Sequence, residues 1–332
     1  MALLPRLFRR SPTVVAIGGG TGASGLLRGL KDHTDKLTAI VAVADDGGSS
    51  GRFRQEFGIL PPGDIRNCLA ALSDAGPVLE ELFQYRFEEG ELRGHAFGNI
   101  FLAALARVTG DFESAVREAN RILAVRGNVL PATATKVSLV ATHSDGAKTT
   151  GETLVGRGLK PVQKLELKPA NAPAAPGVVD AILGADLIVL GPGSLYTSVL
   201  PNLLIPDIRD ALQKTGAVVG YVCNIMTQAG ETQGFTAARH AEVLIEHTFT
   251  GLLDFVLVNN GEVPAALAQA YAAEGGIRVE PDGEALEALP GSPRIVEADL
   301  VNTDNLVRHH PGKLAEILLA TSREMAGDRA KA

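Results

Sequence analysis

The chain has 332 residues, of which 45% are hydrophobic and 21% are charged, a composition typical of a globular protein with a large buried core. Its formal net charge of −7 excludes a general nucleic-acid binder, because a phosphate backbone requires a basic protein face. No window approaches the roughly 18 apolar residues of a membrane-spanning helix, and the N-terminal MALLPRLFRR lacks the apolar centre of a signal peptide.

Short runs rich in β-branched residues predict strands at 13–17, 37–44, 136–142, 186–190, 217–223 and 254–259. Their apolar residues are continuous rather than alternating, as in parallel strands that helices cover on both faces. Apolar residues at helical spacing predict helices at 64–75, where Asp64 is placed to cap the first turn, and at 112–123. This order predicts a Rossmann-like, doubly wound α/β domain with a mostly parallel sheet over residues 13–320.

The other segments are expected to be insertions into that domain or flexible ends. Residues 77–126 have helical patterns without an obvious strand, which predicts a helical insertion, and the Gly-, Lys- and Pro-rich segment 145–177 predicts an irregular β excursion. Residues 1–12 and 323–332 are expected to be flexible ends. Cys68 and Cys223 stand in apolar runs, which favours buried thiols and a cytoplasmic location over a disulfide framework.

The first strand is followed by GGGTGASG at 18–25, a turn that brings backbone N–H groups and a helix N-terminus toward an anion. Gly20, Gly22 and Gly25 match the dinucleotide fingerprint, with Asp45 at the expected distance beyond it. The match is weak by itself, because a glycine turn also serves tight packing. It is not a phosphate-binding P-loop, since no Gly-Lys-Ser/Thr closes it.

The second strand ends in DDGGSSGRFR at 45–54. Asp45 and Asp46 are candidate oxygen ligands of a divalent cation, and the following Gly/Ser amides with Ser49, Ser50 and Arg52 are candidate phosphate contacts. A solvated surface turn is the alternative. The run also fits the G-x-S-x-G pattern of serine hydrolases, a match that glycine-rich segments produce by chance.

Two further strand ends carry polar, glycine-rich loops: GPGSLYTSVLPN at 191–202 and CNIMTQAGET at 223–232. Because ligands bind outside the carboxyl ends of the strands in open α/β sheets, these loops and the first two predict one common site. PPGDIRN at 61–67 and GHAFGN at 94–99 are placed to face it. Besides those above, the candidate ligand residues are Asn99, Gly193, Ser194, Tyr196, Asn224 and Thr227.

Together, GGGTG, DDGGSSGR, PPGDIRNCL, GHAFGN, LGPGSLYTSVLPNLL, YVCNIMTQAGET and VLVNN resemble the gluconeogenesis factor (YvcK-like) family, which is related to 2-phospho-L-lactate transferase (CofD-like). The resemblance runs from about residue 13 to 318, in the same order. Two positions depart from the family pattern. Arg308-His309-His310 stands where the family has Arg-His-Asp, and Ala229 stands where it usually has Pro.

The resemblance implies a cytoplasmic bacterial protein that binds UDP-sugars such as UDP-N-acetylglucosamine, and that is needed for cell shape on gluconeogenic carbon sources. It implies partners in cell-wall synthesis or signalling, and we expect a homo-oligomer. Carried onto this chain, it assigns the phosphate contacts to Gly19, Gly20, Thr21 and Gly22, a possible Mg²⁺ or ribose site to Asp45 and Asp46, and the nucleotide-sugar pocket to Ser194, Tyr196 and Asn224.

Three functions follow from these patterns. The first is a non-catalytic regulator that binds a nucleotide-sugar, which the complete motif set favours. The second is a Mg²⁺-dependent transferase that moves a three-carbon acid from a nucleotide diphosphate, as in the related transferases, with no residue standing out as its base. The third, a NAD-dependent dehydrogenase, depends on the fingerprint alone and leaves the second glycine loop unexplained.

Overall fold

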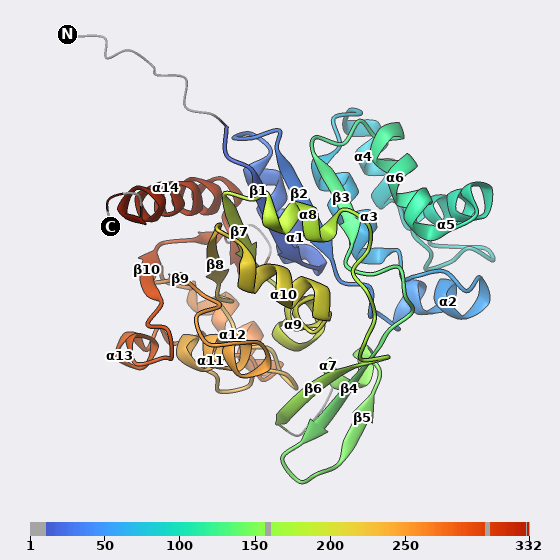
Figure 1. The fold of residues 1–332 in the computed structure, drawn as a ribbon. Helices are drawn as coiled ribbons and strands as arrows, with labels where there is room; N and C mark the ends of the chain where they lie inside the picture. The colour runs from blue at the N-terminus through green and yellow to red at the C-terminus, as the bar shows by residue number, and fades with distance from the viewer. Residues whose placement is uncertain (1–10, 157–160, 303–305, 330, 332) are drawn as a thin grey trace.

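The computed structural model describes residues 11–156, 161–302, 306–329 and 331 (Figure 1). Its centre is a seven-stranded sheet in the order β10-β9-β8-β7-β1-β2-β3, and every neighbouring pair is parallel. The strands are β1 (Val14–Gly18), β2 (Leu37–Val41), β3 (Asn128–Pro131), β7 (Leu187–Leu190), β8 (Val218–Val222), β9 (Phe255–Asn259) and β10 (Arg294–Ala298). The predicted Rossmann-like, doubly wound α/β fold is therefore confirmed.

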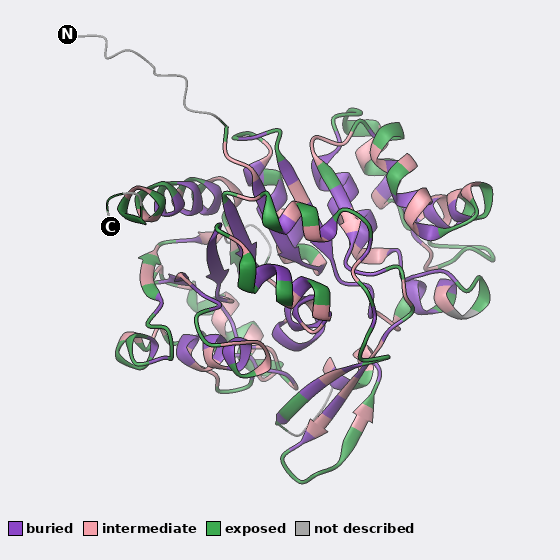
Figure 2. Cartoon of the chain, in the orientation of Figure 1, coloured by how far each residue is buried: buried purple, intermediate pink, exposed green. Residues whose placement is uncertain are grey.

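Helices connect the strands and bury their apolar faces on the sheet. Because the chain moves one way from β1 to β2 and β3, and the other way from β7 to β10, right-handed crossovers place the two sets of helices on opposite faces. β1, β8 and β9 are buried along their whole length, as the continuous apolar runs predict, and Figure 2 shows buried residues throughout the central strands. The two cysteines are buried free thiols.

The helices are α1 (Gly20–Leu30), α2 (Gly48–Glu56), α3 (Gly63–Leu72), α4 (Pro77–Gln84), α5 (Phe97–Thr109), α6 (Phe112–Ile122), α7 (Glu152–Gly156), α8 (Val178–Leu183), the π-helix η1 (Leu195–Val199), α9 (Leu200–Leu203), α10 (Pro206–Lys214), α11 (Ala237–His247), α12 (Ala265–Ala273), α13 (Gly283–Glu287) and α14 (Pro311–Arg329). Helices α4, α5 and α6 fall within the segment predicted as a helical insertion. They pack with α3 beside the β3 edge of the sheet (Figure 1).

The strand predicted at 136–142 does not join the central sheet. It forms β4 (Ser138–His143), which pairs antiparallel with β5 (Lys148–Thr150) and β6 (Val162–Lys168) in a separate three-stranded sheet that projects from the body of the molecule (Figure 1). Burial alternates along β4, so one of its faces is open and it lacks the two-sided cover of a central strand. Antiparallel β11 (Val301–Asn302) and β12 (Arg308–His309) form a further small ribbon.

Strand β3 escaped the sequence analysis because it is four residues long and contains Pro131. It lies at the edge of the sheet, where its outer backbone groups need partners. The Asn120 side chain supplies them: its Oδ1 accepts from Val129 N at 2.9 Å, and its Nδ2 donates to Val129 O at 3.0 Å. A side-chain amide therefore takes the place of another strand at this edge.

The C-terminal segment 323–332 also differs from the flexible end that we expected. Helix α14 continues to Arg329, which pairs with Asp254 and donates to Ala217 O at 3.2 Å. Met325 packs against the hydrophobic core. Residues 323–329 are therefore helical, and these contacts hold the last turns of α14 against β8 and the start of β9.

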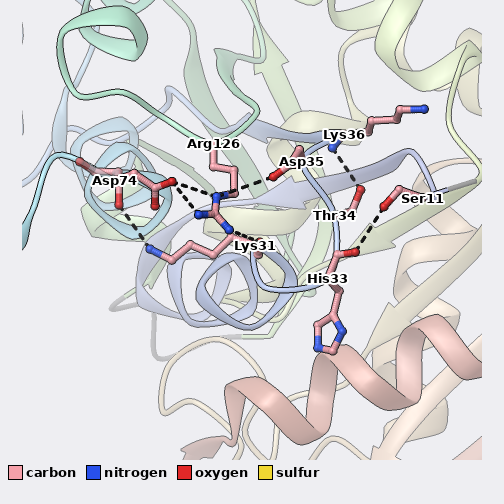
Figure 3. A network of polar contacts seen from close by, with 9 residues as sticks. Ser11, Lys31, His33, Thr34, Asp35, Lys36, Asp74 and Arg126 are labelled. Carbon is pink, nitrogen blue, oxygen red and sulfur yellow. Dashed lines mark hydrogen bonds and ion pairs between the residues drawn. The ribbon is translucent and has the colours of Figure 1, made fainter.

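The end of the sheet opposite the strand carboxyl ends is held by a polar network around Arg126 (Figure 3). Its guanidinium donates from Nε and Nη2 to Asp74 Oδ2 at 2.9 and 2.8 Å, and from Nη1 to Lys31 O at 3.2 Å. Lys31 Nζ in turn donates to Ser73 O at 3.3 Å. These contacts join the α1–β2 connection to the helical region, and they leave the other end of the sheet free for a site.

Candidate functional site

The chain changes direction across the sheet between β1 and β7, and two glycine-rich turns meet there. Gly19–Gly22 follows β1 and opens α1, and Gly191–Ser194 follows β7. A Cβ added at Gly22 would lie 2.4 Å from Pro192 O, so α1 starts in direct contact with the second turn. The first and third predicted loops therefore meet at the switch point of the fold.

A cavity of about 480 Å³ opens between these turns, within the size range of small-molecule sites. It also takes in the start of the loop after β8. Eight of the candidate ligand residues of the sequence analysis line it, namely Gly19, Gly20, Thr21, Gly22, Gly193, Ser194, Asn224 and Thr227.

Several polar side chains of the two later loops are bonded to protein groups. Asn224 pairs with the backbone of Gly193: its Nδ2 donates to Gly193 O at 2.9 Å, and its Oδ1 accepts from Gly193 N at 3.3 Å. Ser194 Oγ accepts from Gln228 Nε2 at 2.8 Å, and Thr227 Oγ1 accepts from Ile277 N at 2.9 Å. These side chains position the loops around the cavity.

The wall facing the glycine turns was missed by the sequence analysis. Its apolar part consists of Ile225, Met226, Tyr271, Leu306 and Val307, and its cations are Arg28 and Arg308. Most of these residues come from α12 and from the segment before α14, far along the chain from the predicted strand ends. Only the departure from the family pattern at 308–310 pointed to this region.

His310, which stands where the family has Asp, begins α14. Its Nδ1 accepts from Lys313 N at 3.3 Å, so the imidazole does the work of an aspartate N-cap. Its neighbour His309 lines the cavity, and its Nε2 donates to Cys223 O at 3.1 Å. Burial lowers the pKa of His309 to about 4, so the ring is neutral near pH 7. The departure at residue 310 therefore preserves the helix start.

The second predicted loop lies outside the cavity lining, with Ser49, Ser50, Arg52 and Asn99 around the start of α2. Tyr196 lies neither in the cavity lining nor near the start of α2. It is fully buried, its phenol donates to Val162 O at 3.3 Å, and burial raises its pKa to about 12. The backbone of η1 turns its ring into the core, so Tyr196 does not line this cavity and its assignment to the pocket stays a prediction.

Asp46 is used within the protein. Its Oδ1 accepts from Thr153 N at 2.9 Å and from Thr153 Oγ1 at 2.8 Å, and its Oδ2 accepts from Glu152 N at 3.1 Å. These are the first backbone donors of α7, so the carboxylate caps that helix. Asp46 is thus committed to holding the start of α7, and its predicted cation role stays a prediction.

Replacing Asp46 with alanine is therefore expected to lower the free energy of unfolding by about 1–2 kcal/mol, the usual cost of losing a cap. Urea unfolding measures this effect. Thr153→Val, which removes only the hydroxyl contact, is the matched control and should cost less. Loss of Mg²⁺-dependent ligand binding in Asp46→Ala, without loss of stability, would instead support the cation role.

Asp64 is the carboxylate that the structure brings to the glycine turn. It does not cap its own helix, whose N-cap is Pro62. A Cβ at Gly19 would lie 2.5 Å from Asp64 Oδ2, and the Gly20 N–H hydrogen-bonds to the same carboxylate. Burial raises the pKa of Asp64 to about 6, the Gly20 bond opposes this, and the charge of Asp45 raises it further.

Asp45 and Asp64 form a pair of hard oxygen donors that fits Mg²⁺, because a divalent cation would relieve the repulsion between two desolvated carboxylates. In the described part of the chain, no group of three His, Cys, Asp or Glu side chains could hold a metal. A bound Mg²⁺ would therefore take its remaining ligands from water and from phosphate oxygens, as Mg²⁺ commonly does.

Glycine turns at a topological switch point, with a cavity between them, define a Rossmann-type small-molecule site of an α/β protein. The family model of 2-phospho-L-lactate transferase CofD matches residues 14–301. A Nostoc sp. protein is 51% identical over 321 residues, which cover 96% of this chain and 70% of that protein. The gluconeogenesis factor of Bacillus subtilis is 45% identical over 316 residues, which cover 95% of this chain and 99% of it.

The crystal structure of a UPF0052-family protein from Bacillus halodurans superimposes with a TM-score of 0.91 at 43% identity, covering 94% of this chain and 99% of that one. The chain belongs to the gluconeogenesis factor family, whose fold is shared with the CofD transferases. Among the described residues, no helix is both long and apolar enough to span a bilayer.

Proposed function

We propose that this protein binds a nucleotide-sugar, UDP-N-acetylglucosamine or a related UDP-sugar, in the cavity between the glycine turns. In doing so it acts in the cytoplasm as a regulator of cell-wall synthesis and cell shape during gluconeogenic growth. The observation that carries the proposal is the division of the cavity into two unlike ends. The choice of uridine and of the regulated process comes from the family resemblance.

One end suits a diphosphate. Gly19–Gly22 brings the first backbone N–H groups of α1 to the cavity. Arg308 adds positive charge to the lining, and so does Arg28, although its Nη2 also lies 3.6 Å from Glu80 Oε1. Gly20 has φ +68, a left-handed conformation that glycine adopts without strain, so the turn is built for close approach of the backbone to a ligand.

The other end suits a base or a sugar ring. Ile225 and Met226 are buried against Val307, and the half-exposed ring of Tyr271 packs on this small cluster. A flat aromatic ring on an apolar wall offers a stacking surface for a nucleobase, which is worth about 1–3 kcal/mol per base. The phosphate end and the apolar end together match the chemistry of a nucleotide-sugar.

A second candidate is the Mg²⁺-dependent transfer of a three-carbon acid from a nucleotide diphosphate. It is favoured by the position of Asp64 against Gly19 and Gly20, next to Asp45. In that transfer the phosphate-linked acid would move to an acceptor and the nucleotide's own phosphate would leave, and a Mg²⁺ held by these two carboxylates would neutralise charge on the leaving phosphate. The residues of the chain would orient the nucleotide through the glycine turns and Arg28, and the cavity would shield the reacting end from water.

The test is a thermal-shift and calorimetric titration with UDP-N-acetylglucosamine, UDP-glucose, GDP and NAD, each with and without Mg²⁺. A ligand at 100 times its dissociation constant stabilises the native state by about 2.7 kcal/mol. We expect UDP-sugars to bind and NAD not to bind. Binding of GDP only with Mg²⁺ would favour the transferase, and binding of NAD alone would contradict both candidates.

Tyr271→Ala is expected to weaken UDP-N-acetylglucosamine binding roughly tenfold, about 1.4 kcal/mol, because the stacking surface is lost. The matched control is Tyr85→Ala, which removes an exposed tyrosine beside α4 and should leave the affinity unchanged. Equal weakening in both variants would show that the effect is indirect and that Tyr271 does not contact the ligand.

A further inference from the structure

Arg66, on α3, is a buried arginine that forms no ion pair with a carboxylate in the part of the chain that the structure describes. The residue is only 7% exposed. Its Nη2 donates to Asn67 Oδ1 at 2.7 Å and its Nη1 donates to Asn99 Oδ1 at 3.4 Å, whereas its Nε has no acceptor among the described residues. Because neutral amides cannot balance a buried guanidinium, this charge is held at a cost of several kcal/mol.

The chain makes room for this arginine. A Cβ at Gly98 would lie 2.7 Å from Arg66 Cγ and 2.9 Å from its Cδ, so the stem of the side chain crosses the first turn of α5 at a glycine. The guanidinium is thereby held beside Asn99 of the same turn. A buried charge that is costly to hold, beside a glycine that makes room for its side chain, is characteristic of a ligand-binding group.

Charged side chains of both signs act on this cluster: Arg52 and Arg86 are the cations, and Asp64 and Glu56 are the acids. Burial, and then the nearby charge of Arg86, lower the pKa of Arg66. Burial, and then the charge of Arg52, lower the pKa of His95. Asp64, one turn earlier on α3, is the acidic group that acts on Arg66 in the opposite direction. Arg52 and Arg86 are exposed and His95 is half-buried, so the cluster is open to solvent.

Two helices also begin at this cluster. Helices α2 and α5 start at Gly48 and Phe97 without side-chain caps. Asn99 Nδ2 donates to Ser49 Oγ at 3.2 Å, and Ser49 Oγ lies 3.1 Å from His95 Nδ1, so the two helix starts are tied together. Their positive ends add to the field of the arginines.

The cluster lies next to the nucleotide cavity but outside its lining. Asp64 touches the glycine turn on one side, and a Cβ at Gly63 would lie 2.6 Å from Ser50 Oγ and 3.7 Å from Asp45 Oδ2 on the other. The Asp45–Asp64 pair therefore separates the cavity from the start of α2.

We propose that Arg66, Asn99, Ser49 and Arg52 form a second anion site, which binds the phosphate group of a separate small-molecule ligand beside the nucleotide cavity. A phosphate supplies the negative charge that the buried guanidinium lacks and accepts hydrogen bonds from the fork of Arg66 and from the start of α2. The phosphate belongs either to the free ion or to a phosphate ester. This site does not depend on which nucleotide the cavity takes.

Asn99→Asp is the sharpest test, because it places a carboxylate where Asn99 Oδ1 already meets Arg66. We expect this variant to have a higher thermal midpoint than the wild type in phosphate-free buffer, and to lose binding of inorganic phosphate by roughly tenfold or more, followed by ³¹P NMR titration. Arg52→Gln, at an exposed position that does not endanger folding, should weaken phosphate binding several-fold.

Two arginine controls separate this site from other phosphate contacts. Arg117→Gln removes an exposed arginine of α6 and should change nothing, and Arg28→Gln removes a cation of the nucleotide cavity. If Arg28→Gln abolishes phosphate binding while Asn99→Asp and Arg52→Gln do not, the phosphate sits in the cavity and the proposal is overturned. A lower thermal midpoint of Asn99→Asp with unchanged phosphate affinity would overturn it as well.

Titrations with inorganic phosphate and with glycerol 3-phosphate distinguish the two sources of the phosphate group. Binding of either ligand that depends on Asn99 supports the site, and tighter binding of the ester identifies an organic ligand. Absence of binding by both overturns the proposal. Titration of the same variants with UDP-N-acetylglucosamine tests the nucleotide site separately, so that failure of one proposal is not mistaken for failure of the other.

Discussion

Replacing Gly22 with alanine is expected to lower the free energy of unfolding by about 1–3 kcal/mol, and to weaken nucleotide-sugar binding by roughly tenfold or more. The added Cβ would lie 2.4 Å from Pro192 O and 2.9 Å from Pro192 C, and both atoms are backbone. The helix start and the second glycine turn must therefore separate. That movement changes the cavity at the end that would hold the phosphates.

Gly25→Ala in the same helix is the matched control for stability. No atom lies within 4 Å of a Cβ built at Gly25, so the substitution meets open space. It should raise the free energy of unfolding by about 0.5–1 kcal/mol, the ordinary gain of alanine over glycine inside a helix. Urea unfolding of the two variants measures the difference. If both change stability equally, the contact between Gly22 and Pro192 carries no special cost.

Replacing Glu231 with glutamine is expected to reduce the dependence of stability on pH. Glu231 is 8% exposed; its Oε2 accepts from Tyr196 N at 3.3 Å and its Oε1 from Thr197 Oγ1 at 3.2 Å. Burial raises the pKa of this carboxyl to about 7, against the lowering effect of those hydrogen bonds. Between about pH 4.5 and pH 7 the folded protein therefore retains a proton that the unfolded chain has lost.

The sign follows from proton linkage. Where the native state binds more protons than the unfolded state, stability falls as pH rises, by up to about 1.4 kcal/mol per pH unit for one group. Wild-type stability should fall between pH 4.5 and pH 7, and Glu231→Gln should remove a loss on the order of 2–3 kcal/mol. Glu152 acts in the same direction, since burial and then the charge of Asp45 raise its pKa to about 7.

Urea unfolding at pH 4.5, 6, 7 and 8 checks this prediction. Thr197→Val is the informative control, because it removes one hydrogen bond to the carboxylate and leaves the titrating group in place. Its profile should keep the slope or become steeper. A Glu231→Gln profile parallel to that of the wild type at every pH would show that Glu231 titrates alike in the folded and unfolded chain.

The sequence predicted five of the seven strands of the central sheet, and it missed β3 and β10. Continuous apolar runs at β1, β2, β7, β8 and β9 indicated strands covered on both faces, because burial on two sides leaves no polar alternation. The apolar run at β4 has the composition of a central strand, but β4 pairs with β5 and β6 in a separate sheet. Strand β3 was too short to detect.

The candidate site shows the same contrast between features that the sequence predicts and features that only the structure shows. Backbone turns such as Gly19–Gly22 are visible in sequence, because consecutive glycines directly after a strand mark a turn. The roles of polar side chains are not, since Asp46 could cap α7 or hold a cation, and only the position of Thr153 decides. Asp64, Arg66 and Tyr271 gain their significance from neighbours distant in the chain.

By itself, then, the sequence determined the parallel α/β sheet, the glycine turns at its carboxyl edge and membership in the gluconeogenesis factor family. These features depend on local composition, periodicity and motif order. The tertiary structure alone decided which carboxylates face the turns, which polar side chains are consumed in holding loops, and where an unpaired buried charge remains. Those properties depend on distances between residues far apart in the chain, which no local pattern records.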